Sequence, residues 1–552
     1  MSFCRNESQQ ISFFDSTFGL TERELKRLKG SWAETFSAKV FPLINEQRFS
    51  VLYSDNPASR PNTPVNINMG LLMLKAMFDL TDDEAFESIL FDIRFQYALR
   101  TTSFDEQPIS QNSLSNFRRL VYQYNLEHGV DLIQEEIESH AKAFAKMLKI
   151  GGDTMRMDSL MISSSCKNLS RLELIYSCIE RVIKDIAEQI PDKMPGKFAM
   201  YLKEGNRNEV IYRSKDAALT DKLQSSITDA LELYTIFSGS EISNCDSFLL
   251  LRRMLGEQAN ISDGVAVLKE NKDIRSDSLQ NPTDPDATFR EKSGEDYKGF
   301  VGNVVESFDD KNVIITGYDL QPNIYSDITF SAGVIEQLGK QENELNMIVD
   351  GAYYSDAIEE KAAANNINMI PTALVGRTTA KDGSENFVVD DERHLVTACP
   401  LGHCPNKSTC NAKGDCRATF PKELCDNCEN KSNCPIIPQK KTYLFKTSKS
   451  KHSRQKLMQK METTEYKEIA DKRAGIEGIP SVLRRRYGID YLPVRGLVRS
   501  KVWLGLKIGA INIKRVVKAL CLRELLSIYI HAQALNQPFV NLRSCKRMNF
   551  AA

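Results

Sequence analysis

The chain has 552 residues, of which 41% are hydrophobic and 26% charged, and its formal net charge is −1. These values are ordinary for a soluble globular protein and leave room for several domains with cores of their own. The first residues lack the apolar segment of a secretory signal, and no apolar run reaches the ~18 residues of a membrane span, so we expect a cytoplasmic protein without membrane segments.

Charge is unevenly distributed along the chain. Residues 436–515 hold 20 Lys or Arg against 6 Asp or Glu. A basic block of this length indicates either an anionic partner or a solvated face.

Three short helices are predicted near the N-terminus. Asn66–Asp79 has an amphipathic pattern, a capping box at Thr81–Glu84 opens a second helix that extends through Leu99, and Ser110–Tyr124 forms a third. The third helix carries Arg118 and Arg119. This arrangement is typical of a helix-turn-helix reader of DNA, although a plain packing module has the same pattern.

The middle of the chain alternates helices and strands. The predicted elements are, in order, a helix at Glu127–Ile150, a strand at Thr154–Ile162, a mostly helical stretch at Ser170–Leu268, strands at Phe300–Glu306 and Asn312–Tyr318, a helix at Ser326–Gly339, a strand at Leu345–Asp350, a helix at Ser355–Asn365 and a strand at Asn368–Val375. The order predicts an α/β fold in which helices flank a mixed sheet.

Two aspartates are associated with predicted strands. Asp350 ends a buried run and is followed by Gly351, which lets the chain turn. Asp158 lies in the earlier strand. Ligands of open α/β sheets lie at the carboxyl ends of strands, so the two carboxylates could meet at one sheet edge. An ordinary turn aspartate is the alternative for Asp350.

Glu477 lies in the basic stretch, four residues after Arg473 and seven before Arg484. On a helix, both arginines would lie near the face of the glutamate and could hold DNA phosphates, although an ordinary Arg–Glu surface pair fits the spacing equally well. Three converging carboxylates would repel one another unless cations lay between them, and oxygen ligands suit Mg²⁺ or Mn²⁺. Gly475, Gly478 and Pro480 predict that this helix is short or kinked.

Seven of the 13 cysteines fall between residues 399 and 434. Without an export signal we expect them to be reduced, so metal binding is favoured over disulfides. The candidates for a structural Zn²⁺ are Cys404, Cys425, Cys428 and Cys434, against the alternative of reduced thiols in a loop insertion. The adjacent lysine-rich run 440–460 favours contact with phosphates.

Several segments together resemble a DDE transposase of bacterial insertion sequences, in the insertion sequence eleven-eighty-two family. The resemblance spans about residues 55–520. It is carried by Arg60-Pro61, Leu80-Thr-Asp-Asp-Glu84, Ser113-Leu-Ser-Asn-Phe-Arg-Arg119, the Asp158 segment, Thr283-Asp-Pro-Asp-Ala287, Val349-Asp-Gly-Ala-Tyr-Tyr354, the Arg473, Glu477 and Arg484 spacing, Tyr487-Gly488, Arg495-Gly496 and Asn512-Ile-Lys-Arg515.

The resemblance implies an RNase H-like catalytic core in which Asp158, Asp350 and Glu477 bind two Mg²⁺ (or Mn²⁺) ions. It implies cleavage of double-stranded DNA at terminal inverted repeats, strand transfer into target DNA, action as a homodimer, and a place with the bacterial nucleoid in the cytoplasm. The DNA-binding residues that we expect are Arg118, Arg119, Arg473, Arg484, Arg495, Lys514 and Arg515.

The expected domains are an N-terminal helical DNA-binding domain (1–130), a first part of the catalytic core (131–375) with a helical insertion at about 165–280, a Cys- and Lys-rich insertion (376–460) and the C-terminal helices of the core (461–552). Two other hypotheses remain open at this point. One is a catalytically inactive, transposase-derived DNA-binding protein, and the other is a zinc-dependent nucleic-acid-binding protein whose carboxylates are incidental.

Overall fold

The computed structural model describes residues 1–6, 15–56, 58–212, 216–292, 294–375, 383–390, 393–412 and 414–534. The chain divides into two compact units. Unit 1 contains Met1–Gly151, Ser159–Ser326 and Ile479–Ala552, and unit 2 contains Gly152–Asp158 and Asp327–Gly478. Among the helices in the described ranges, none combines the length and apolar character needed to span a membrane.

The N-terminal part of unit 1 is helical, as predicted. Its α-helices are α1 (Glu22–Lys29), α2 (Trp32–Thr35), α3 (Val65–Phe78), α4 (Asp82–Phe91), α5 (Ile93–Ala98), α6 (Ser113–His128) and α7 (Leu132–Leu148). The predicted capping box is present at the start of α4, where Thr81 and Glu84 bond each other's backbone N–H. The single helix expected as far as Leu99 is instead two helices. Asp92 adopts an extended backbone, and its carboxylate accepts the N–H of Arg94 at 2.8 Å to begin α5.

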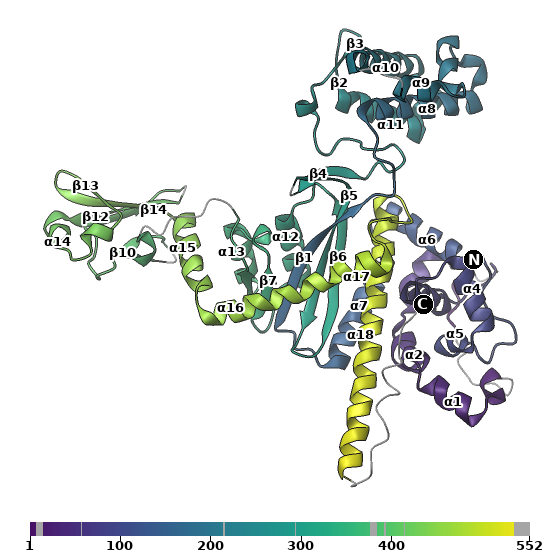
Figure 1. Ribbon diagram of the computed structural model, residues 1–552, viewed down its shortest axis with the longest axis horizontal. Coiled ribbons are helices and arrows are strands. Elements are labelled where there is room, and N and C mark those ends of the chain that lie inside the picture. The colour runs from purple at the N-terminus through teal and green to yellow at the C-terminus, as the bar shows by residue number, and fades with distance from the viewer. Residues whose placement is uncertain are drawn as a thin grey trace. The chain divides into compact units, whose positions relative to one another are not determined.

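The last helix, α18 (Leu497–Ala534), forms the centre of unit 1 and packs against α3, α7 and a strand, β6 (Val313–Pro322) (Figure 1). The amphipathic character predicted for Asn66–Asp79 is wrong, because α3 is buried around almost its whole circumference, as suits a helix that is apolar on most of its faces. The side chain of Asn512 pairs with the backbone of Ile315 in both directions, at 2.9 and 2.7 Å. A buried amide that is satisfied in this way fixes the register of α18 on β6.

The predicted helical insertion contains α8 (Arg171–Gln189), α9 (Asn206–Tyr212), α10 (Asp216–Phe237) and α11 (Asp246–Gln258), which share a hydrophobic core. Its last ten residues are not helical. They form a hairpin of β2 (Ala259–Ser262) and β3 (Val265–Leu268). The two residues of the turn, Asp263 and Gly264, both have positive φ (51° and 77°), and an Asp-Gly pair readily adopts such a hairpin turn.

The strands form a mixed sheet, so the predicted α/β class is confirmed. In unit 1, β5 (Glu295–Phe308) pairs in antiparallel fashion with β4 (Thr288–Lys292) and β6, and it also neighbours β1 (Thr154–Ser163). In unit 2, the first residues of β1 pair in parallel with β7 (Leu345–Val349), which pairs in parallel with β8 (Ile367–Pro371). The helices α12 (Asp327–Leu338) and α13 (Asp356–Ala364) accompany β7 and β8.

A second, antiparallel sheet lies in the Cys-rich part of unit 2. Its strands are β11 (Lys407–Cys410), β12 (Asp415–Pro421), β13 (Ile436–Pro438) and β14 (Thr442–Ser448), and the short strands β9 (Val388–Val389) and β10 (Val396–Ala398) pair with each other. Cys410 and Cys416 are registered partners on β11 and β12 and form a disulfide. Two of the seven clustered cysteines are therefore not reduced thiols, because the hairpin brings them together.

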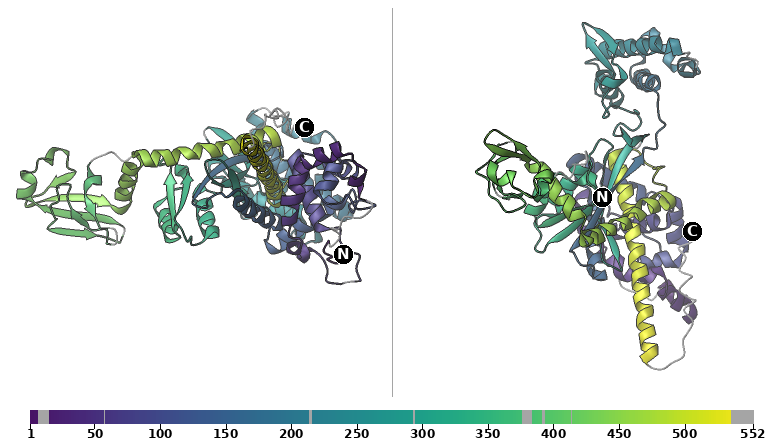
Figure 2. Two further views of the ribbon diagram at one scale, coloured as in Figure 1. Left: turned by 90° about the horizontal axis from the view of Figure 1, so that it is seen from below. Right: turned by 60° about the vertical axis from the view of Figure 1, so that its left-hand side comes forward.

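One short helix, α14 (Lys422–Asp426), lies between β12 and β13 of this sheet. After β14 the chain is helical, through α15 (Lys449–Met461), α16 (Thr464–Asp471) and the 3-10 helix η12 (Lys472–Glu477) (Figures 1 and 2). With the next helix, α17 (Gly478–Tyr487), the chain returns to unit 1, which resumes at Ile479. Glu477 is thus the last residue of a tight 3-10 segment, as expected from the poor helix formers around it.

Candidate active site

Asp158 lies on β1, and Asp350 directly follows β7, the strand that pairs in parallel with the start of β1. The register of β1 on β7 pairs Thr154 with Asn346 and Arg156 with Ile348. Continuing this register by two residues places Asp158 opposite Asp350, which is the first residue after β7. Neighbouring strands lie about 4.8 Å apart, so this continuation of the register would bring the two carboxylates to one edge of the parallel strands, where we expect them from the sequence.

The backbone around Asp350 fixes the direction of its carboxylate. Asp350 caps the short 3-10 helix Gly351–Tyr353, and its Oδ1 accepts the N–H of Gly351 at 2.6 Å. A Cβ on Gly351 would overlap the carbonyl group of Ala373, which follows β8. Only glycine fits where the chain passes this close to another backbone.

Arg473 joins two of the three predicted carboxylates. Its Nη2 lies 3.3 Å from Oδ1 of Asp158, and its Nη1 lies 3.7 Å from Oε1 of Glu477. The side chains of Arg473 and Asp158 are 19% and 17% exposed, whereas that of Glu477 is 66% exposed. Asp158 and Glu477 therefore lie on two sides of one planar cation, and the i, i+4 Arg–Glu pair that we weighed as an alternative is also present.

Three contacts tie the segment that carries Glu477 to the strands. The hydroxyl of Tyr466 on α16 donates to the carbonyl of Pro371, at the end of β8, at 2.8 Å. Nη1 of the buried Arg156 donates to the carbonyl of Lys472, the first residue of η12, at 2.6 Å. The third contact is the pair of Arg473 with Asp158. Arg156 and Asp158 are two residues apart on β1 and so face the same side of the sheet, which is the side on which η12 lies.

The residues present fit an oxygen-ligated cation in the kind of ligand and in part of the geometry. Carboxylate oxygens are the ligands that Mg²⁺ prefers, and Asp158 and Asp350 lie on or directly after two strands that pair in parallel. A positive group, the guanidinium of Arg473, already lies between Asp158 and Glu477. Over the described ranges, however, no three Asp, Glu, His or Cys side chains are arranged as ready-made metal ligands. Metal binding would therefore require Arg473 to turn away and Glu477 to move inward.

Arg118, Lys514 and Arg515 are among the predicted DNA-binding residues that make internal contacts in unit 1. Arg118 on α6 forms a salt bridge with Asp82 on α4. On α18, Nζ of Lys514 lies 3.0 Å from the hydroxyl of Tyr487, and Nη1 of Arg515 lies 2.9 Å from Glu306, whose side chain is fully buried. These partners are distant in sequence, so spacing alone gave no sign of them.

Other predicted basic residues line an open cavity of about 680 Å³ in unit 1, between α6 and the segment 494–499. Arg119 and Arg495 are exposed there, with Arg118 beside them. Arg499, which we did not predict, adds a further exposed guanidinium that lies over the ring of Tyr122. Clustered guanidinium groups next to an aromatic ring are typical of phosphate-binding surfaces.

Arg484 has a different environment. It lies on α17 with 43% of its side chain exposed, where its Nε is 3.4 Å from Asp490 and its Nη2 is 3.5 Å from the carbonyl of Met161. Part of the Arg484 side chain therefore remains accessible to a phosphate group.

The Thr283–Ala287 segment, which resembles a family marker, holds the start of α18. Oδ1 of Asp284 accepts the N–H of Gly496 at 3.0 Å, and Oδ2 of Asp286 accepts the N–H of Leu497 at 2.9 Å. Two carboxylates at a helix N-terminus satisfy free N–H groups and complement the helix dipole. The marker segment and the Arg495-Gly496 pair are therefore parts of one structure, the N-terminal cap of α18.

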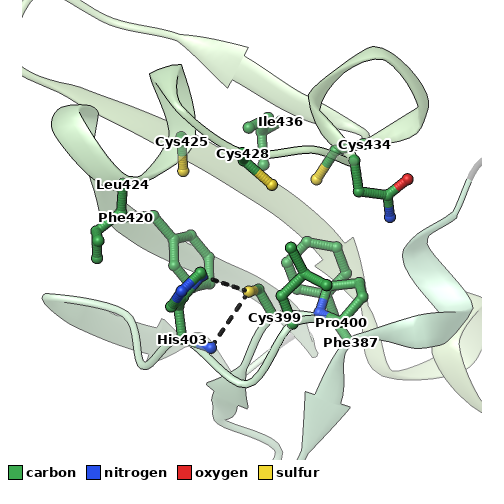
Figure 3. Close-up of a pocket in the computed structure, with 12 residues that line it drawn as sticks. Phe387, Cys399, Pro400, His403, Phe420, Leu424, Cys425, Cys428, Cys434 and Ile436 are labelled. Atoms are coloured by element: carbon green, nitrogen blue, oxygen red, sulfur yellow. Dashed lines mark hydrogen bonds between the residues drawn. The ribbon is translucent and has the colours of Figure 1, made fainter.

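The Cys-rich region brings together a set of cysteines that differs from the predicted set. A small pocket is lined by Cys399, Cys425, Cys428 and Cys434, whereas Cys404 is exposed and does not line it (Figure 3).

Comparisons with known proteins agree with the resemblance at the level of the general family. Residues 398–517 match the family described as "Transposase DDE domain", and residues 26–120 match that described as "Transposase domain (DUF772)". A search of curated proteins gave no match. One solved structure, the cryo-EM structure of the piggyBac transposase synaptic complex with hairpin DNA, aligns over 94% of this chain and 77% of that chain. The identity is 9% and the TM-score is 0.27, which is too low to carry an argument. The two family matches support a DDE-type transposase.

Proposed function

We propose that this chain is a transposase of the insertion sequence eleven-eighty-two family with an RNase H-like core, and that it cleaves DNA at the terminal inverted repeats of a mobile element. The observation that carries the proposal is that Arg473 links Asp158 to Glu477. Asp158 lies on β1, and Asp350 directly follows β7, which pairs in parallel with the start of β1. The two matches to transposase families support the same reading.

In this proposal Asp158, Asp350 and Glu477 would hold two Mg²⁺ or Mn²⁺ ions. Such ions would activate the attacking water or 3′-hydroxyl and stabilise the leaving oxygen of the phosphodiester. Arg156 and Tyr466 position η12, and Arg473 balances the charge of the acidic side chains. The protein thus contributes positioning and charge neutralisation, which are the main demands of phosphoryl transfer.

Double-stranded DNA would be bound by the basic surface of unit 1. Arg119, Arg495 and Arg499 supply exposed guanidinium groups at the α6 cavity, and the helices within residues 1–130 would form the DNA-binding domain. Action on two paired transposon ends by a homodimer, followed by strand transfer into target DNA, completes the proposal.

The decisive experiment compares Asp350→Asn with the wild-type chain on DNA that carries the inverted repeats of the element. We expect the variant to lose Mg²⁺-dependent cleavage by at least about 1,000-fold while binding the DNA as tightly as the wild type, because the amide keeps the shape but not the charge. The control is Asp356→Asn, at the start of α13, which changes a carboxylate outside the site. Undiminished cleavage by Asp350→Asn would remove this residue from the mechanism.

A second candidate function is a catalytically inactive DNA-binding protein derived from a transposase. The pairing of Arg473 with both Asp158 and Glu477 favours it, because the guanidinium occupies the space that the carboxylates would share with a metal. This candidate predicts that the wild-type chain binds the repeats and cuts them with neither Mg²⁺ nor Mn²⁺.

A further inference from the structure

The Cys-rich part of unit 2 gathers four thiols from three separate segments. Cys399 follows β10, Cys425 lies on α14 with Cys428 just after it, and Cys434 precedes β13. In Figure 3 the sulfur atoms of Cys425, Cys428 and Cys434 lie along one side of the pocket, and that of Cys399 lies across from them. The arrangement is a property of the fold, because these residues span 35 positions of sequence.

The size and lining of the pocket suit a single ion. Its volume is about 20 Å³, which is room for one water-sized body, and the remaining lining is mostly apolar, with Phe387, Phe420 and Ile436. The four cysteines are free, in contrast to Cys410 and Cys416, which form a disulfide in the same region.

A backbone group already points at one of the sulfurs. The N–H of His403 points at Sγ of Cys399 at 3.4 Å, across a turn closed by a 2.9 Å bond from the N–H of Cys399 to the carbonyl of His403. Hydrogen bonds from N–H groups to sulfur are the outer-shell contacts that orient and stabilise thiolate ligands.

The four thiols line one small pocket, so their sulfur atoms are neighbours. Four neighbouring thiolates are tolerated only when a cation balances their charge.

We propose that Cys399, Cys425, Cys428 and Cys434 form a structural zinc site in which Zn²⁺ is held by four thiolates. Zinc prefers tetrahedral sulfur ligands in closed structural sites, and Cys425-x-x-Cys428 has the spacing of a typical ligand pair. Across the described residues no three potential ligands are already at bonding geometry, so the four sulfurs would have to move closer together to hold zinc. His403 orients Cys399 through its backbone and its ring, whose Nδ1 is 3.5 Å from Sγ, and is not itself a ligand.

The role of the ion follows from the size of the local core. Among the described residues, the local core around β12 and β14 is a cluster of six buried side chains, which include Phe387, Phe420 and Phe445. Small cores of this kind are commonly completed by a disulfide or a metal. Zinc would tie α14 and the segments before β13 and after β10 to one point, and so stabilise the four-stranded sheet.

The test is the zinc content of the full chain, purified under reducing conditions and dialysed against metal-free buffer. We expect about one zinc per chain, by mass spectrometry of the metal, and a loss of about tenfold or more in Cys428→Ser and Cys434→Ser. Cys404→Ser is the matched control, since Cys404 is an exposed cysteine of the same region outside the pocket. A wild-type chain without zinc, or equal zinc in all variants, overturns the site.

Two further measurements keep the test independent of whether the variants fold. With Co²⁺ in place of zinc, the wild type should show thiolate-to-cobalt absorption, and His403→Ala should retain it; loss of metal in His403→Ala would overturn the four-thiolate assignment. Chelation of the wild type should speed trypsin cleavage between residues 383 and 448, and Zn²⁺ but not Mg²⁺ should reverse this. Because neither measurement uses DNA, failure of the zinc site and failure of the proposed transposase activity are separate results.

Discussion

The guanidinium of Arg156 fills the space that a side chain on Gly475 would need. A Cβ on Gly475 would overlap Nη1 and Cζ of Arg156, whose Nη1 donates to the carbonyl of Lys472 three residues earlier. Because Gly475 has no side chain, Arg156 on β1 can reach and hydrogen-bond the backbone of η12, the 3-10 helix that ends at Glu477.

We therefore expect Gly475→Ala to displace η12 and to reduce cleavage by about 100-fold, the usual effect of moving a catalytic group by about 1 Å. Gly478→Ala is the matched control, because nothing lies within 4 Å of a Cβ at that position. The measurement is the rate of strand cleavage at saturating DNA. Equal rates for the two variants would show that the close approach to Arg156 does not position Glu477.

Arg156→Lys tests the same contact from the strand. A lysine keeps the charge but loses the planar group that reaches the carbonyl of Lys472, and a hydrogen bond from a charged group contributes about 1.5–3 kcal/mol. We expect a fall of this order in the free energy of unfolding of unit 2, together with slower cleavage and unchanged DNA affinity. A loss of affinity instead would assign Arg156 to DNA contact.

Exposed and paired arginines of unit 1 should respond differently to salt. Arg119 is exposed at the α6 cavity, so Arg119→Ala should lower the slope of log K against log salt concentration by about 1. Arg515 pairs with the buried Glu306, so Arg515→Ala should leave the slope unchanged and cost about 1–3 kcal/mol of unfolding free energy. Binding titrations over a range of salt, with urea melts of the same proteins, distinguish the two; the reverse outcome would contradict the assignment.

Lys514 predicts a dependence of stability on pH. Burial, and then the nearby charges of Arg486 and Lys507, lowers the pKa of Lys514 from 10.5 to about 8. Between pH 8 and 10.5 the unfolded chain therefore holds more protons at this group than the folded chain, and the free energy of unfolding gains a contribution that rises with pH.

Urea midpoints at pH 8 and pH 10 should show that rise in the wild type, and Lys514→Met should reduce it. Lys518→Met, an exposed lysine four residues along α18, should not. If both variants behave as the wild type does, burial does not perturb Lys514.

The two strand aspartates illustrate how far the sequence reaches. An apolar run closed by Asp350-Gly351 predicts a strand end, and β7 does end at Val349, directly before Asp350, and pairs in parallel with the start of the strand that carries Asp158. The bridging role of Arg473 was not predictable, since it depends on η12 lying over the face of β1 that carries Asp158. Spacing within a helix predicts only the contact of Arg473 with Glu477.

The basic residues and the cysteines show why other features of the sites could not be predicted from the sequence. Arg118 and Arg515 appear in the sequence as free positive charges, because their acidic partners lie 36 and 209 positions away. The choice between Cys399 and Cys404 depends on the turn after β10, where a 2.9 Å backbone bond from Cys399 to His403 directs Cys399 to the pocket. No rule of sequence spacing encodes that direction.

The caps that Asp284 and Asp286 provide for α18 have a consequence for biosynthesis. Their partners, Gly496 and Leu497, lie more than 200 positions downstream, and all of unit 2 after Asp158 is translated in between. Protein synthesis adds about 5–20 residues per second, so β6 remains without its packing partner α18 for a time on the order of ten seconds. Unit 2 is complete by Gly478 and can fold first, so chaperones on the ribosome are expected to engage the exposed strands of unit 1 during this interval.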